Sequence, residues 1–407
     1  MIRYHAAWVL PIAEPPIRDG WVAVDRGRVV AVGRRGPGDT RSESGVDDVD
    51  LGHVALMPGL VNAHTHLELS YMLDDVPPAP DFVTWIRTVV ETRREQPDPR
   101  APKILDAVER GIRESIESGT AVVGDISNTL VTFEPLAGSA LAGVVFFEIL
   151  RFNAPDPGAV VEHARQSIEA LVPTERVRAS LAAHAPYSVA PLVFRAIRQA
   201  VDRNPFAPCS VHLSESPAEV EFIKSGTGPW RQFLEDVGAW NPSWVAPAVS
   251  PVEYLEANGF LHERVLAVHG VQMTEKDLAC LVKRGVTLVT CPRSNGHTGA
   301  GAPPIGQFYK SGVRVAVGTD SLASAPDLNV FAELATMRAL EPSIPASVLL
   351  ESATRNGARA LGFEADYGTI EAGKRSRLLV VSVTPGVGDV EEYLVSGVRP
   401  DQLRWVE

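Results

Sequence analysis

Apolar and polar positions follow two patterns along this chain, and together they predict a barrel flanked by a small sheet. Between about residues 56 and 364, apolar runs of strand length alternate with amphipathic stretches of helical period, which is typical of a parallel sheet wrapped by helices. Eight such runs predict an α/β fold of the (β/α)8 TIM barrel type. The expected strands are 54–62, 120–126, 142–149, 177–184, 209–213, 265–269, 286–291 and 313–319. A doubly wound open sheet is the alternative, but no glycine-rich phosphate loop follows the first strand.

Both ends of the chain are rich in β-branched residues. Residues 21–33 place a turn signal between two such runs, which predicts a hairpin, and residues 368–383 have the same character. We therefore expect the two ends to meet. The predicted division is a small β-sandwich domain from residues 1–55 plus 365–407, and a barrel over 56–364. The long excursion at 67–100 is expected to form a wall of a pocket.

Polar side chains follow four of the expected barrel strands. Because parallel strands present their carboxyl ends at one face of a barrel, where such barrels place active sites, we expect these side chains to converge. A lone His-x-His is weak evidence for metal, but three imidazoles and a carboxylate with an open position are typical of catalytic zinc. The expected ligands are His64, His66, His212 and Asp320, accompanied by Glu215 and His269.

Charge and composition exclude several classes of partner. The formal net charge is −12, and we find no basic stripe, so nucleic acid is not an expected partner. No segment has the length or apolar character of a signal peptide or membrane span, so we expect a cytoplasmic protein without membrane contact. The three cysteines are widely spaced and form neither a disulfide framework nor a zinc motif. The sequence is compatible with a homo-oligomer.

Four longer motifs give the chain a resemblance to the amidohydrolase superfamily. These are Met-Pro-Gly-Leu-Val-Asn-Ala-His-Thr-His at 57–66, Gly-Thr-Asp at 318–320, Ala-Thr-Arg-Asn-Gly-Ala-Arg-Ala-Leu-Gly at 353–362, and Gly-Thr-Ile-Glu-Ala-Gly-Lys at 368–374. Within it, His-Leu-Ser-Glu at 212–215 and Cys-Pro-Arg-Ser-Asn at 291–295 resemble the branch that deaminates adenine-type bases. His-Leu-Glu-Leu-Ser at 66–70 and Phe-Val-Thr-Trp at 82–85 are most similar to the aminodeoxyfutalosine deaminases of the alternative menaquinone pathway.

The resemblance implies a hydrolase with one divalent transition metal ion, Zn²⁺ first and Fe²⁺ as the alternative. Two-metal members usually need a lysine after strand four, and residues 177–187 contain none. Zinc lowers the pKa of a bound water to roughly 7, which supplies a nucleophile. Asp320 would take the water proton, His269 would orient the water, and Glu215 would protonate the ring nitrogen. The alternatives without a catalytic role are that His269 caps a strand and that Glu215 is a carboxylate at a helix N-terminus.

Six further residues are predicted to bind substrate, each with an alternative left open. Glu68 binds ribose hydroxyls or supports a ligand histidine, and Trp85 stacks on the substrate or packs in the core. Arg151 receives a substrate carboxylate or is solvated, and His184 faces substrate or is an ordinary loop histidine. The remaining two, which either line the pocket or cap a helix, are Ser294 and Asn295.

The resemblance, together with these residues, implies hydrolytic deamination of a small 6-aminopurine nucleoside derivative, with aminodeoxyfutalosine first. The alternatives are a deaminase of S-adenosylhomocysteine or methylthioadenosine, and an amidase or chlorohydrolase that uses the same ligands. A non-catalytic binding module is disfavoured, because no metal ligand is missing.

Overall fold

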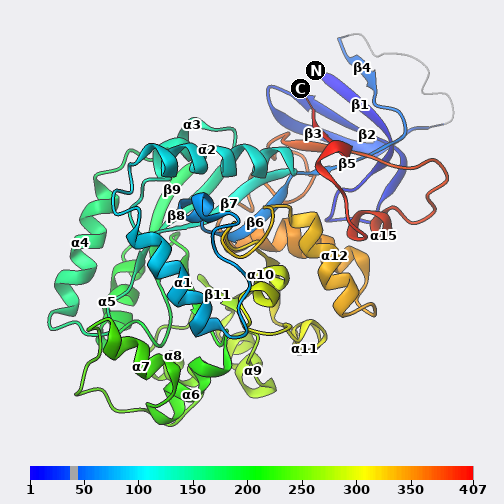
Figure 1. Ribbon diagram of the computed structural model, residues 1–407. Coiled ribbons are helices and arrows are strands. Elements are labelled where there is room, and N and C mark those ends of the chain that lie inside the picture. The colour runs from blue at the N-terminus through cyan, green and yellow to red at the C-terminus, as the bar shows by residue number, and fades with distance from the viewer. Residues whose placement is uncertain (37–44, 407) are drawn as a thin grey trace.

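Eight parallel strands form a closed barrel in the computed structural model, which describes residues 1–36 and 45–406 (Figure 1). Each strand pairs with its neighbour along the chain, from β6 to β13. The last strand meets the first through a parallel bridge between Thr65 and Asp320, which closes the ring. The strands are β6 (Leu60–Thr65), β7 (Thr120–Ser127), β8 (Ala142–Ile149), β9 (Val177–Ala183), β10 (Cys209–Leu213), β11 (Val265–His269), β12 (Thr287–Thr290) and β13 (Arg314–Val317). The predicted (β/α)8 barrel is confirmed.

The first expected strand, 54–62, is wrong as a single element. The chain forms β5 (Val54–Pro58) and β6, which belong to different sheets and are separated at Gly59. A Cβ atom at Gly59 would lie 2.6 Å from Cβ of Ala121, so the chain passes close to β7 where it changes sheet. Both strands are buried along their whole length, and for this reason one unbroken apolar run covers them.

Helices surround the barrel and pack on its strands (Figure 1). Many begin at a proline that follows a capping residue, as α6 does at Pro217, where the side chain of Ser216 accepts a hydrogen bond from the backbone of Glu219. The helical elements are η1 (Leu67–Met72), α1 (Phe82–Arg94), α2 (Pro102–Glu117), α3 (Phe133–Gly138), α4 (Pro157–Glu169), α5 (Pro191–Asp202), α6 (Pro217–Ser225), α7 (Pro229–Asp236), α8 (Pro251–Ala257), α9 (Glu275–Arg284), α10 (Pro292–His297), α11 (Ile305–Ser311), α12 (Val330–Leu340), α13 (Ala346–Glu351), the π-helical η2 (Ser352–Asn356), α14 (Gly357–Ala360), α15 (Val390–Val395) and η3 (Pro400–Gln402).

The two chain ends meet in a small β domain, as predicted (Figure 1). Its strands follow the order β15-β14-β5-β1-β2-β3, with β4 also paired to β1. The predicted hairpin is confirmed as the antiparallel pair of β2 and β3. The strands are β1 (Ile2–Val9), β2 (Ile17–Asp25), β3 (Arg28–Arg34), β4 (Asp47–Asp50), β5, β14 (Leu378–Ser382) and β15 (Leu403–Trp405). The domain limits 1–55, 56–364 and 365–407 stay a prediction, and β5 runs past the first of them.

In the part of the chain that the structure describes, each helix is too short or too polar to cross a bilayer.

Candidate active site

Histidines and an aspartate from four barrel strands converge at the carboxyl end of the barrel. His64 and His66 come from β6 and the residue after it, His212 from β10, His269 from β11, and Asp320 follows β13. The ring of His64 lies with its centroid 4.9 Å from that of His66 and 5.0 Å from that of His212. Oδ1 of Asp320 is 3.4 Å from Nε2 of His66 and 3.7 Å from Nε2 of His64. The structure thus brings together all four predicted metal ligands and His269.

These side chains have the chemistry that a transition metal requires. Burial lowers the pKa of His212 to about 3 and holds the pKa of His66 and of His269 well below the ordinary value, so the imidazoles are neutral. Both ring nitrogens of His64 are buried and have no hydrogen-bond partner among the described residues. Leaving them so is costly unless a ligand satisfies them. His64 forms two three-residue clusters with ligand atoms within 4.8 Å of one another, one with His66 and Asp320 and one with His212 and His269.

Asp320 is held so that one of its oxygens faces the histidines. Its Oδ2 accepts hydrogen bonds from the hydroxyls of Ser294, at 2.5 Å, and Ser324, at 3.1 Å. Its backbone has φ of +60°, which turns the chain at the strand end. Gly318 is needed just before this turn, because a Cβ there would lie 2.8 Å from both Cβ and the carbonyl oxygen of His64. The turn that closes the barrel after β13 therefore also places the Asp320 carboxylate beside the histidines.

In two site histidines, His212 and His269, the ring nitrogen Nδ1 contacts a neighbouring residue. Nδ1 of His212 donates to the carbonyl oxygen of His184 at 2.9 Å, which leaves Nε2 to face the cluster. Nδ1 of His269 lies 3.0 Å from Nδ2 of Asn295, and the backbone of His269 has φ of +77°. Non-glycine residues in this left-handed region are uncommon and concentrate at functional sites. The structure therefore places Asn295 against a site histidine.

Glu215 lies beside the cluster, with Oε1 3.5 Å from Nε2 of His269. Burial, with the charges of Asp320 and Glu219 adding to it, raises the pKa of Glu215 well above its ordinary value. Glu219 was not expected from the sequence. Its two oxygens accept hydrogen bonds from the backbone N–H groups of Ser214, at 2.8 Å, and Glu215, at 2.9 Å. The Ser-x-x-Glu pattern at 216–219 is the signal that could have predicted that the Glu219 side chain folds back and binds the backbone before the helix.

The structure places Glu68 under the pocket wall, where protein groups engage both of its oxygens. Oε1 pairs with Nη2 of Arg93 on α1. Oε2 accepts a hydrogen bond at 2.7 Å from the hydroxyl of Ser127, and further ones from the backbone N–H groups of Asn128 and Thr129. Glu68 is not among the residues that line the pocket above the cluster, whereas Arg93 is the only arginine or lysine among them within the described chain.

The wall of this pocket is largely aromatic. The structure places Trp85 here, with its ring centroid 5.9 Å from that of Phe82 on the same helix. Phe82 contacts Trp230 of α7 at 6.0 Å, and Trp230 stacks on Tyr187 at 3.7 Å. His184 also lines the pocket, and burial lowers its pKa to about 4. The predicted wall from the 67–100 excursion is therefore present, and α7 completes it.

Like Glu68, three further predicted substrate-binding residues lie away from the pocket surface. Ser294 and Asn295 are fully buried behind Asp320 and His269, in the contacts described above. Arg151 is exposed and donates to the carbonyl oxygen of Leu150, which itself lines the pocket. The structure thus brings Trp85 and His184 to the pocket and leaves these three outside its lining.

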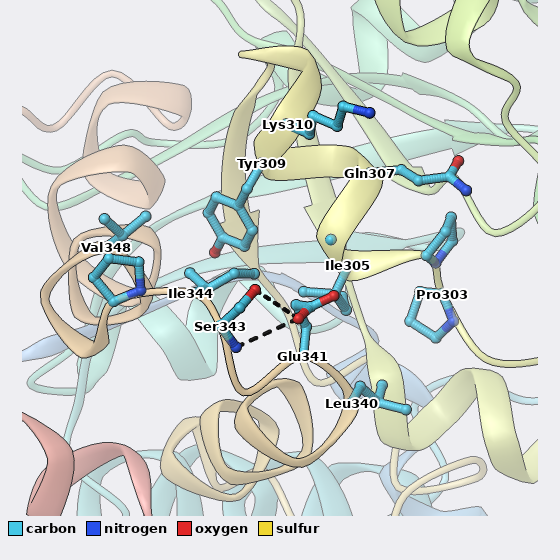
Figure 2. Close-up of a pocket in the computed structure, with 13 residues that line it drawn as sticks. Pro303, Ile305, Gln307, Tyr309, Lys310, Leu340, Glu341, Ser343, Ile344 and Val348 are labelled. Atoms are coloured by element: carbon cyan, nitrogen blue, oxygen red, sulfur yellow. Dashed lines mark hydrogen bonds between the residues drawn. The ribbon is translucent and has the colours of Figure 1, made fainter.

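A larger hollow lies elsewhere on the surface, between α11 and the segment from α12 to α13 (Figure 2). Its volume is about 790 Å³, against about 180 Å³ for the pocket above the histidines. Figure 2 shows Glu341 there, accepting hydrogen bonds from the backbone and hydroxyl of Ser343. It contains none of the predicted site residues. Convergent buried ionisable groups indicate a functional site better than volume does, so the smaller pocket is the candidate active site.

Comparisons with known proteins show which family the chain is similar to. The profile described as "Amidohydrolase family" matches residues 55–399. An aminodeoxyfutalosine deaminase of Deinococcus radiodurans is 32% identical over 320 residues, covering 75% of this chain and 73% of that protein. A 5-methylthioadenosine/S-adenosylhomocysteine deaminase of Desulforudis audaxviator is 30% identical over 404 residues, covering 92% and 83%. The crystal structure of an adenosine deaminase from Xanthomonas campestris with bound zinc has a TM-score of 0.83 at 26% identity, covering 99% and 90%.

Proposed function

The chain belongs to the amidohydrolase family and is a hydrolytic enzyme, and we propose that it removes the 6-amino group of an adenine-type nucleoside, with aminodeoxyfutalosine as first substrate. One observation carries the proposal: a buried carboxyl group, Glu215, lies beside a cluster of neutral imidazoles and a carboxylate at the carboxyl end of the barrel. Deamination of an aromatic amidine needs a proton donor at the ring nitrogen, in addition to an activated water. An open-chain amide has no ring nitrogen for this donor to protonate.

His64, His66, His212 and Asp320 would hold one divalent metal ion, Zn²⁺ first and Fe²⁺ as the alternative. The ion would supply Lewis-acid activation of a water molecule. The zinc in the Xanthomonas campestris adenosine deaminase supports this choice of metal.

The remaining site residues are proposed to transfer protons or to position another side chain. His269, through Nε2, orients the attacking water, and Asp320 accepts its proton. Glu215 protonates the ring nitrogen next to C6, takes up the proton of the hydroxyl group added at C6, and delivers it to the departing amine. The proton held by Asp320 then restores Glu215, so that one water is consumed and one ammonia is released. Ser294 and Asn295 act behind Asp320 and His269 as positioning residues. The aromatic wall with Trp85 would hold the apolar parts of the substrate.

The second candidate substrate class is methylthioadenosine and S-adenosylhomocysteine. The relative that bears both names aligns with 92% of this chain, whereas the aminodeoxyfutalosine deaminase aligns with 75%. The pocket offers an aromatic wall and one cation, Arg93, to the 5′ substituent. The exposed Arg151 is a proposed contact only for a substituent that reaches out of the pocket.

The test is an ultraviolet assay of the adenine-to-hypoxanthine change with aminodeoxyfutalosine, methylthioadenosine, S-adenosylhomocysteine and adenosine. We expect turnover of at least one nucleoside, fastest for aminodeoxyfutalosine. Turnover of methylthioadenosine without aminodeoxyfutalosine would replace the first substrate by the second. Hydrolysis of amides or haloaromatics without any deamination would contradict the proposal.

Partners and location are part of the same proposal. The net charge of −12 supports a protein that binds neither nucleic acid nor an anionic membrane surface. We propose that its partner is a small nucleoside and that it works in the cytoplasm. Size-exclusion chromatography with light scattering would decide whether it is a homo-oligomer.

A further inference from the structure

Glu148 of β8 carries a buried oxygen without a hydrogen-bond partner among the residues that the structure describes. Its Oε2 accepts a hydrogen bond from Nδ2 of Asn128 at 2.8 Å, but Oε1 has no hydrogen-bond partner among the described residues. The residue is 6% exposed and lines the pocket above the metal-ligand cluster. Leaving a buried carboxyl oxygen unpaired is costly, so its partner is expected to arrive with the substrate.

A chain of hydrogen bonds fixes this carboxyl group in place. Nη1 of Arg93 donates to Oδ1 of Asn128 at 2.6 Å, and Arg93 is itself paired with Glu68. Because an arginine can only donate, the Asn128 amide must turn its oxygen to Arg93 and its nitrogen to Glu148. This chain of hydrogen bonds therefore engages one oxygen of Glu148 and leaves the other without a partner among the described residues. It runs from Glu68 through Arg93 and Asn128 to Glu148.

The free oxygen lies where the sugar of a bound nucleoside is expected. It is 3.5 Å from Nδ1 of His212, the ring nitrogen other than the Nε2 that faces the metal-ligand cluster. A base with its reacting carbon at the cluster carries its sugar at the opposite end of the ring system. His184, whose Nδ1 lies 2.6 Å from the hydroxyl of Ser188, lines the same part of the pocket.

A hydroxyl group fits this oxygen better than a charged group does. A hydroxyl can donate to the carboxylate and can also accept from the carboxylic acid, so it satisfies Glu148 in either protonation state. An ammonium group would need the ionised form alone.

We propose that Glu148 is a specificity-determining residue, whose Oε1 hydrogen-bonds a hydroxyl of the substrate's sugar. This inference rests on the proposed nucleoside function and adds which residue reads the sugar. The competing explanation is that Glu148 only orients His212, from which it is 3.5 Å away.

The test compares the nucleoside that is turned over fastest with its 2′-deoxy and 3′-deoxy analogues, on wild-type protein, Glu148→Gln and Glu148→Ala. The control is Glu109→Gln, which changes a glutamate with a 63% exposed side chain on α2. For each pair, kcat and KM are measured separately, and bound metal is counted by mass spectrometry.

On wild-type protein we expect one deoxy analogue to lose roughly 10- to 100-fold in kcat/KM, the range for hydrogen bonds to charged groups. Glu148→Gln should lose about 10-fold on the parent nucleoside, chiefly through KM, and less than about 3-fold on that deoxy analogue, with metal content unchanged. The Glu109→Gln control should match wild type.

Three results would overturn the inference. The first is equal kcat/KM for the parent and both deoxy analogues on wild-type protein, a measurement that needs no folded variant. The second is a loss in Glu148→Gln that is the same for all nucleosides and accompanied by lost metal, which would leave only the role toward His212. The third is no deamination of any nucleoside by wild-type protein, and this result alone would also overturn the proposed function.

Discussion

Replacing Glu219 by glutamine should lower kcat, because Glu219 holds the backbone that carries Glu215. Glu219 is fully buried and holds the backbone N–H groups of Ser214 and Glu215 on its two oxygens. Glutamine keeps one acceptor and turns an NH2 group toward the other N–H donor. One of the two N–H groups then loses its partner, next to a residue whose φ is +53°, Ser214.

The size of the effect follows from these contacts. A buried N–H group without a partner costs about 1–3 kcal/mol. For 407 residues, an unfolding entropy of about 2.1 cal/mol/K per residue converts this cost into a Tm decrease of roughly 1–4 °C. Displacement of the Glu215 carboxyl group by about 1 Å should cost on the order of 100-fold in kcat.

The assay combines calorimetric melting with steady-state deamination. Glu221→Gln is the matched control, because Glu221 lies on the same helix, is exposed, and its carboxylate accepts a hydrogen bond from the hydroxyl of Thr227. We expect Glu219→Gln to retain its metal and lose most of its kcat, and Glu221→Gln to behave like wild type. Wild-type kcat and Tm in Glu219→Gln would refute the reasoning that this carboxylate positions Glu215.

Four further changes have distinct expected outcomes. Glu215→Gln should keep its metal and lose at least about 100-fold in kcat, and unchanged turnover would remove its assigned role. Ser294→Ala should weaken metal binding roughly 10-fold in a chelator competition, with unaltered affinity counting against the hydroxyl's role. Gly318→Ala should lower both Tm and metal occupancy, because its Cβ would meet His64, and a wild-type melt would contradict this. Burial raises the pKa of Asp125 to about 7, so the folded chain keeps a proton that the unfolded chain releases above about pH 4, and stability falls as pH rises through that range. Asp125→Asn should therefore gain Tm relative to wild type between pH 5 and pH 8, and a constant difference between the two would contradict that sign.

The sequence predicted the barrel and the converging strand ends because both follow from local patterns. Strand-length apolar runs ending in His64, His212, His269 and Asp320 identify four strands and one face of the barrel. The apolar run 54–62 did not show that it divides into two strands, because burial in two different sheets produces the same composition as burial in one.

The supporting contacts could not be predicted in the same way. Asn128 is engaged by Arg93 and Glu148, residues that are distant in sequence and polar in ways typical of many exposed positions. Glu68 was singled out as a substrate-binding residue, but nothing local showed that Arg93 would pair with it. The left-handed φ of His269 is likewise set by the barrel's rim, because a histidine has no intrinsic preference for that conformation strong enough to predict it.

The most direct test of the metal-dependent chemistry is a metal titration of the chelator-treated protein, followed by the ultraviolet deamination assay at each step. We predict that turnover vanishes when the metal is removed and returns in proportion to added Zn²⁺ or Fe²⁺, reaching its plateau at one ion per chain. Full turnover by metal-free protein, or a plateau at two ions, would contradict a single site built from His64, His66, His212 and Asp320.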